Sequence, residues 1–164
     1  AAGHLLKRLE TRIHILMFDG EDPKIKSYIE SMKSARSFNI ILVNEDLSHI
    51  YKISEALASN ELVCIHADRF LTKNKTISAK FLGKKTFFPE GPFQLALKFG
   101  VPVAFVYAFK ADLLKYHFYS SNIKYYSKRD GHSIETVLND YLYDLEEKLR
   151  VYPEQWFNYY KFWN

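Results

Sequence analysis

Apolar residues in the first part of the chain alternate between runs of strand length and runs with helical spacing. The short runs are rich in β-branched residues and predict three strands, at residues 13–18, 39–43 and 62–67. Helical spacing predicts a helix over residues 23–35. A further helix, capped by Asp46 or Ser48, is predicted from its apolar positions Ile50, Ile53 and Leu57. Strands that alternate with helices in this way predict right-handed β-α-β units.

A turn, a short helix and an apolar run follow one another over residues 87–109, FFPEGPFQLALKFGVPVAFVYAF. Gly91 and Pro92 predict a chain reversal and a helix start, and Gly100 predicts a left-handed cap at the end of that helix. The run at 103–109 lacks polar alternation, which is typical of a strand covered on both faces. We therefore expect an α/β fold with a mainly parallel central sheet flanked by helices on both faces. The Pro-Glu-Gly corner would lie at the rim of that sheet, where ligands of open α/β folds usually bind.

The last third of the chain predicts an outer element and one long helix. The alternating stretch KYHFYSSNIKYY, residues 115–126, predicts an outer strand or hairpin with a turn at residues 120–122. Ser133 can cap the most regular helix, whose charged positions, Asp144 among them, are expected to face water. Its apolar stripe consists of Ile134, Val137, Leu138, Tyr141, Leu142, Leu145 and Leu149.

Composition narrows the class of protein. A chain of 164 residues with 48% hydrophobic residues has the size and core of one domain, and its net charge of +4 fits an ordinary solvated surface. No apolar run approaches the roughly 20 residues that span a bilayer. The single cysteine, Cys64, excludes a disulfide within the chain and lies in an apolar run that favours its burial. The 12 Tyr, 13 Phe and 2 Trp are more aromatic residues than a core of this size requires. Some of them can lie at an interface with lipid headgroups or with another domain.

A basic segment separates the third predicted strand from the Pro-Glu-Gly corner. Residues 69–86 contain six positive charges and no acidic residue: Arg69, Lys73, Lys75, Lys80, Lys84 and Lys85. Such a segment is either a solvated loop or an anion site for a phosphorylated headgroup or an acidic carrier protein. Its position after a strand and beside the corner favours the anion site. Arg36, before the second strand, is a candidate for a second phosphate contact.

Two blocks of sequence resemble a known family. Phe88-Pro89-Glu90-Gly91 resembles the FPEG block of the glycerolipid acyltransferases, and residues 88–103 are similar to the corresponding segment of bacterial lipid A late acyltransferases. Residues 153–156, PEQW, resemble a block near the C-terminus of the same family. The resemblance implies a glycerolipid acyltransferase-like fold. It also implies transfer of a fatty acyl chain from acyl carrier protein or acyl-CoA to a lipid A-like or other membrane lipid.

We assign the family's catalytic pair, a His and an acidic residue with four residues between them, to no residues of this chain. His4 is followed at that offset by Leu9, and His49, His66, His117 and His132 have no acidic residue there. His14 alone has one, Asp19, at the end of the first predicted strand. We expect the dyad upstream of Ala1, so that residues 1–164 form a single acyltransferase-like domain at the C-terminal part of a longer protein and are inactive alone. A homologue that truly lacks the dyad is the alternative.

The resemblance leaves the substrate-binding residues as the candidate site. They are Asp68, Arg69, Lys84, Lys85, Pro89, Glu90, Gly91 and Arg36. Asp68-Arg69 departs from the Asp-Gln-Asp that the family usually has at this position, which weakens any paired-carboxylate role. The expected location is the cytoplasmic face of the bacterial inner membrane, peripheral, with any membrane anchor upstream.

Other chemistries have little support in the sequence. One Cys and scattered His do not form a metal-ligand pattern, and no glycine-rich phosphate loop follows the first strand, so we expect neither a metal nor a cofactor. No nucleic-acid partner is expected, because the basic residues cluster in one segment without a recognised binding motif. A non-catalytic lipid- or anion-binding module is the competing interpretation.

Overall fold

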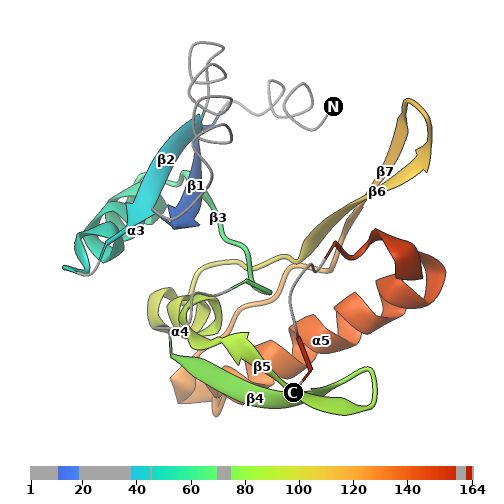
Figure 1. Cartoon of the computed structure of the whole chain (residues 1–164). Coiled ribbons are helices and arrows are strands. Elements are labelled where there is room, and N and C mark those ends of the chain that lie inside the picture. Colours follow the sequence, from blue (N-terminus) through green and yellow to red (C-terminus); the bar gives the residue numbers. More distant parts are fainter. Residues whose placement is uncertain (1–10, 19–37, 45, 70–74, 158–161, 164) are drawn as a thin grey trace. The chain divides into compact units, whose positions relative to one another are not determined.

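The computed structural model describes residues 11–18, 38–44, 46–69, 75–157 and 162–163 (Figure 1). The chain divides into two compact units, Ala1–His66 and Ala67–Asn164. The helix expected over residues 23–35, and Arg36 after it, lie outside the described residues. The expectation that residues 1–164 form one acyltransferase-like domain stays a prediction.

The first unit contains a parallel three-stranded sheet with the order β2-β1-β3. Its elements are β1 (Ile13–Phe18), β2 (Phe38–Val43), α3 (Ser48–Ala58) and β3 (Leu62–Cys64). Ile13 pairs with Phe38 on one side and with Leu62 on the other, so the first strand of the chain is the central one. The three predicted strands are confirmed, although β3 ends at Cys64 instead of residue 67. Cys64 is exposed, and the expectation that it is buried is wrong.

Helix α3 begins where the sequence predicts. Asp46 Oδ1 accepts a hydrogen bond from the backbone N–H of Ser48 at 2.9 Å, which satisfies one of the free amides at the helix start. This bond lowers the pKa of Asp46 from its ordinary value. The residue in the cap position is Leu47, which has a left-handed backbone (φ 60°) and no side-chain acceptor. Asp46 therefore caps the helix from one residue further upstream.

The second unit begins with an antiparallel hairpin of β4 (Thr76–Phe81) and β5 (Lys84–Pro89). Leu82 and Gly83 join the strands with φ values of 49° and 81°, the left-handed pair that matches the twist of a two-residue hairpin. Ile77, Ala79 and Phe81 alternate with exposed residues, so one face of β4 packs inward. The solvated loop, one of the two alternatives for the basic segment, is therefore excluded for residues 76–86, which form strands and their turn. Lys73 lies outside the described residues.

A second antiparallel hairpin consists of β6 (Val106–Asp112) and β7 (Lys115–Ser120). Leu113 and Leu114 form its turn, so the turn expected at residues 120–122 is misplaced. Alternate residues of β6 are exposed, with Val106 70% exposed, and the expectation of a strand covered on both faces is wrong. Residue 103 forms only an isolated antiparallel bridge with Lys124.

The fold class is confirmed as α/β, whereas the mainly parallel central sheet is not confirmed. Within the described residues only β1, β2 and β3 are parallel, and the other strands form two separate antiparallel hairpins. The reason is local. Two-residue turns at 82–83 and 113–114 reverse the chain, so the strands on either side of each turn pair antiparallel. A parallel pair would need a crossover connection of a dozen residues or more.

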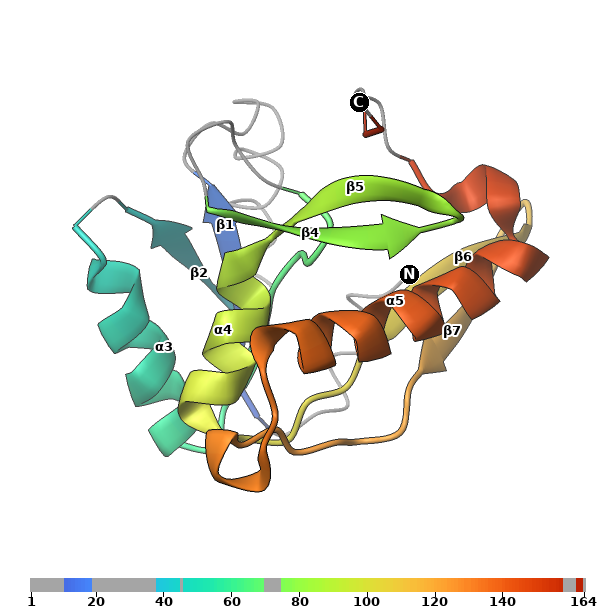
Figure 2. The same ribbon diagram turned by 90° about the horizontal axis from the view of Figure 1, so that it is seen from below.

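Two helices complete the second unit: α4 (Glu90–Phe99) and α5 (Ile134–Val151), with 3-10 turns at η1 (Lys128–Asp130) and η2 (Pro153–Gln155). Gly100 ends α4 with a left-handed cap (φ 59°), as predicted. Ser133 and Thr136 form a reciprocal capping box at the start of α5, which confirms the predicted cap. Figure 2 shows α5 alongside α4 and the β4–β5 hairpin.

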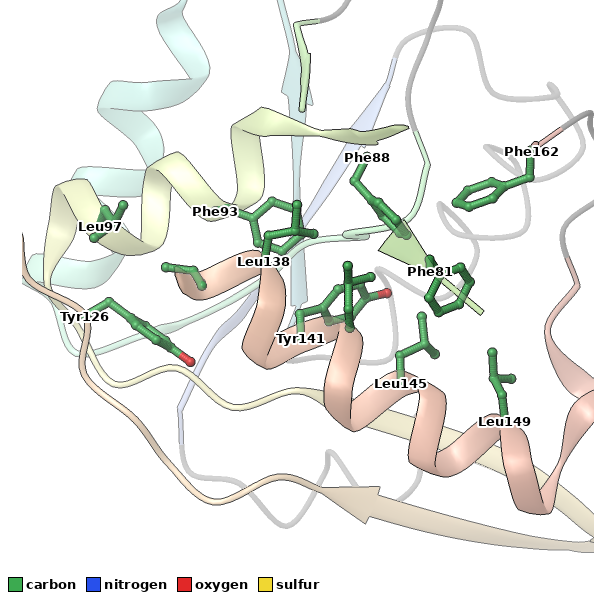
Figure 3. Close-up of a cluster of buried hydrophobic side chains, with 12 residues drawn as sticks. Phe81, Phe88, Phe93, Leu97, Tyr126, Leu138, Tyr141, Leu145, Leu149 and Phe162 are labelled. Carbon is green, nitrogen blue, oxygen red and sulfur yellow. The ribbon is translucent and has the colours of Figure 1, made fainter. Parts of the chain in front are cut away.

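The core of the second unit forms between the β4–β5 hairpin, α4 and the apolar stripe of α5 (Figure 3). Phe81 and Phe88 are completely buried, and their rings meet edge to face at 5.6 Å. Phe162 joins this cluster from the C-terminus, and its carbonyl accepts a hydrogen bond from the buried Thr86 hydroxyl. Each fully buried aromatic side chain contributes roughly 1.5–3 kcal/mol from burial alone. None of the described helices is long and apolar enough to cross a membrane.

Candidate functional site

The Pro-Glu-Gly elbow, residues 89–91, joins β5 directly to α4. Pro89 is buried and occupies the cap position of the helix, while Gly91 is exposed. The backbone N–H of Glu90 donates to the carbonyl of Lys75 at 3.0 Å, which closes the open end of the hairpin. Glu90 lies in the first helical turn, where a carboxylate interacts favourably with the helix dipole. The elbow is therefore a fixed corner with its glycine at the surface.

Gly91 has no local structural reason to be glycine. Its φ is not in the left-handed region, and a Cβ built on it would meet no atom of the described residues within 4 Å. Gly100, by contrast, has φ 59°, which side chains rarely adopt. A glycine without a conformational or packing requirement leaves the backbone open to close approach by another molecule.

Lys80 and Lys85 lie on the outer face of the β4–β5 hairpin, whereas Lys84 pairs with the buried Phe81 at the end of the opposite face. Lys80 lies directly opposite Lys85 in the antiparallel register, and Lys84 follows the turn. Like charges in opposite positions are unfavourable, and neither Lys80 nor Lys85 has a carboxylate partner among the residues that the structure describes. Phe87, 41% exposed, lies on the same face because it is two residues from Lys85. This face can bind an anion through two ammonium groups beside an aromatic ring.

Asp68 is held by the C-terminal PEQW segment. Its Oδ2 accepts a hydrogen bond from the indole Nε1 of Trp156, 88 residues later, at 3.0 Å. The Trp156 ring packs edge-on against Phe81 at 5.1 Å and against Phe162 at 4.9 Å. Arg69, the neighbouring candidate, is exposed.

Gln155 attaches the same segment to β6. Its Oε1 accepts from the backbone N–H of Lys110 at 2.7 Å, and its Nε2 donates to the Lys110 carbonyl at 2.8 Å. The amide side chain thus makes the pair of bonds that a neighbouring strand would make. The PEQW segment therefore joins β6 to the stretch that follows β3. This shared contact role is a structural reason for these four residues to occur together.

The arrangement contains the two sequence blocks in defined geometry: an elbow that opens a helix, and a PEQW segment that holds an aspartate. A family model described as bacterial lipid A biosynthesis acyltransferase matches residues 6–164. The chain belongs to this family. No curated protein matched the chain.

Membership in the lipid A acyltransferase family establishes the class of reaction, a lipid A acyltransferase-like function, and with it an acyl donor and a lipid acceptor. The suspected resemblance is therefore confirmed. The structure gathers Lys84, Lys85, Pro89, Glu90 and Gly91 along β5 and the start of α4, whereas it ties Asp68 to Trp156.

The sequence of this acyltransferase did not predict a buried polar pair near Asp68. The hydroxyl of Tyr107 and Oδ2 of Asp144 are buried without a hydrogen-bond partner among the described residues. Burial raises the pKa of Tyr107, and the nearby charges of Asp144 and Asp68 raise it further. Asp144 was expected to face water, which is wrong for this oxygen. Tyr107 sits in an apolar run and Asp144 in a charged one, so neither carries a local signal.

A histidine–carboxylate pair in the first unit was also missed. His14 Nε2 lies 2.6 Å from Oε2 of Glu61, and the two side chains are 11% and 21% exposed. The pair joins β1 to the residue that precedes β3. Because 47 residues separate the partners, a search at the family's spacing cannot find it. Among the described residues no group of three or more His, Cys, Asp or Glu could hold a metal ion.

Proposed function

We propose that this chain transfers a fatty acyl group from a carrier thioester to a membrane lipid acceptor of the lipid A type. The family match over residues 6–164 carries the proposal. The elbow and the lysine-bearing face of the β4–β5 hairpin support it, since they supply an accessible backbone corner and an anion-binding surface on one continuous piece of chain. The proposed place of action is the cytoplasmic face of the bacterial inner membrane.

The proposed step balances without a cofactor. The acceptor hydroxyl attacks the thioester carbonyl and forms an ester bond, while the carbon–sulfur bond of the donor breaks. A general base takes the hydroxyl proton, and the leaving thiolate takes up a proton to become the free thiol.

Within this proposal the outer face of the β4–β5 hairpin binds the donor. Both candidate donors present a phosphate on the pantetheine arm, and acyl carrier protein is acidic as well. Lys80 and Lys85 are the exposed cations of this face that can approach such groups. Lys84 and Arg69 are further exposed cations that we assign to the donor. Asp68, Pro89, Glu90 and Gly91 are assigned to the acceptor side, and Arg36 to a second phosphate contact.

The test is an acyl-transfer assay with the full product of the gene that encodes this chain. Labelled acyl-acyl carrier protein and labelled acyl-CoA are supplied in turn, with lipid A precursors and phospholipids as acceptors. We expect label in a membrane lipid from one of the two donors. No transfer from either donor to any acceptor would refute the proposal, and lipid binding without turnover would support a non-catalytic module instead.

A matched pair of variants tests the donor face. Lys85→Gln removes one member of the opposed lysine pair and should raise KM for the donor about fivefold, with little change in kcat, because a surface charge contact is worth about 1 kcal/mol. Lys128→Gln removes another exposed cation, from η1, and should change neither constant. Equal effects of both variants would show that net charge, and not this face, acts on the donor.

A further inference from the structure

The β6–β7 hairpin ends in a fully exposed tip. All six residues from 111 to 116, defined here as the hairpin tip, are exposed. Leu113 and Leu114 form the turn and are 78% and 91% exposed. Figure 1 shows the hairpin extending away from α5. Single exposed apolar side chains are common on protein surfaces, but two adjacent leucines at the end of a projecting ribbon have no partner that would explain them within the described chain.

The base of the hairpin is anchored firmly. Phe109 is 4% exposed and stacks on Tyr152 with ring centroids 4.4 Å apart. Tyr119 on the paired strand shares a hydrogen bond of 2.7 Å with the same Tyr152 hydroxyl, and Gln155 bonds both backbone groups of Lys110. The leucines therefore lie at the end of a hairpin whose base is held in place. Because the hairpin is already ordered in the folded protein, binding through its tip costs little further conformational entropy.

We propose that the hairpin tip inserts Leu113 and Leu114 into the headgroup boundary of an anionic lipid bilayer. Two leucine side chains are far too small for a stable protein interface, which buries about 800 Å² on each partner. A bilayer has no such minimum, since each buried methylene contributes about 0.8 kcal/mol independently. A lipid surface is therefore the occupant that suits a small, projecting apolar tip.

The flanking residues have the chemistry of a membrane interface. Lys110 and Lys115 are exposed cations on either side of the leucines, and neither has an ion-pair partner among the described residues. Tyr116, 43% exposed, lies directly opposite Lys110 and has the amphipathic ring that favours the headgroup layer. The only acidic residue of the tip, Asp112, accepts a hydrogen bond from the Leu113 backbone N–H at 2.7 Å and so supports the turn.

The spacing along the strand fits the depth of the headgroup layer. Leu113 follows Lys110 by three positions, which corresponds to about 10 Å of antiparallel strand. Interfacial elements bury their apolar side roughly 5–10 Å into the boundary between headgroups and acyl chains. Lys110 can therefore contact lipid phosphates while the leucines reach the first acyl carbons.

This inference rests on the proposed function only for the expectation that the acceptor is a membrane lipid. Vesicle binding is measured without an acyl donor, so its failure is distinguishable from a failure of acyl transfer.

The experiment is co-sedimentation of the full chain with vesicles of phosphatidylglycerol and phosphatidylethanolamine, compared with vesicles of phosphatidylcholine. The double variant Leu113→Ser with Leu114→Ser should lower the partition coefficient about tenfold or more. The matched control, Ile123→Ser with Tyr143→Ser, removes two apolar side chains that are 66% and 73% exposed elsewhere in the second unit and should leave binding unchanged. Lys110→Gln with Lys115→Gln should weaken binding to the anionic vesicles alone.

A reporter variant locates the contact. Leu113→Trp should show a blue-shifted emission with anionic vesicles and quenching by lipids brominated near the headgroup, relative to the spectrum of the native tryptophans. Unchanged binding of the leucine double variant, an equal loss in the control, or an emission spectrum of the Leu113→Trp reporter that vesicles do not alter would each overturn the proposal. A change in oligomeric mass of the leucine variant without vesicles would overturn it in favour of self-association.

Discussion

Replacing Trp156 by Phe tests whether the PEQW segment holds Asp68. The substitution removes the indole N–H that donates to Asp68 at 3.0 Å and keeps an aromatic ring against Phe81 and Phe162. A hydrogen bond to a charged acceptor contributes about 1.5–3 kcal/mol, and the partly buried position of both residues places the expected loss near about 2 kcal/mol. Hydrogen exchange of amides in the second unit measures that loss without assuming that both units unfold together.

A double-mutant cycle separates this bond from the loss of indole volume. Trp156→Phe and Asp68→Ala are made singly and together, and the coupling energy should be about 1–2 kcal/mol. Other interactions of Asp68 are present in both legs of the cycle and cancel. A coupling energy below about 0.3 kcal/mol would refute the reasoning, because residues that do not interact are additive within that margin. If Asp68 contributes to the acceptor site, Trp156→Phe should also raise KM for the acceptor.

Three further outcomes follow from particular positions. Gly83→Ala should destabilise the hairpin by about 1 kcal/mol because of its φ of 81°. Gly91→Ala should leave the melting temperature unchanged or slightly raised and should reduce acyl transfer. Equal melting temperatures for the two variants would contradict this reasoning. Burial raises the pKa of Tyr107 and of Tyr126, so their contribution to stability should be constant below about pH 10 and fall above it, where the unfolded tyrosines ionise. Absorbance at the phenolate band during alkaline titration measures this, and simple ionisation of both tyrosines near pH 10 would be inconsistent with it. Phe81→Ala should cost about 3–5 kcal/mol, measured by denaturant unfolding against exposed Tyr143→Ala as the control.

Local signals in the sequence determined most secondary structure and both family blocks. β-branched runs located β1 and β2, Gly100 located the end of α4, and Ser133 located the start of α5. These features depend on residues within a few positions of one another, where propensity, capping and turn chemistry act. The elbow was located by its resemblance to the FPEG block, although α4 begins at Glu90, before the Gly91-Pro92 pair that was expected to reverse the chain.

Pairing between distant segments was decided by the tertiary structure. The basic segment became the β4–β5 hairpin because Leu82-Gly83 forms a tight turn and Phe81 and Phe88 are buried in one cluster with the apolar stripe of α5, a helix that begins far later in the chain. In the same way, the Asp68–Trp156 bond and the His14–Glu61 pair join residues 88 and 47 positions apart. The sequence by itself carries periodicity and motif spacing, which are local. Which polar groups meet depends on how packed elements exclude water, and that is a property of the folded chain alone.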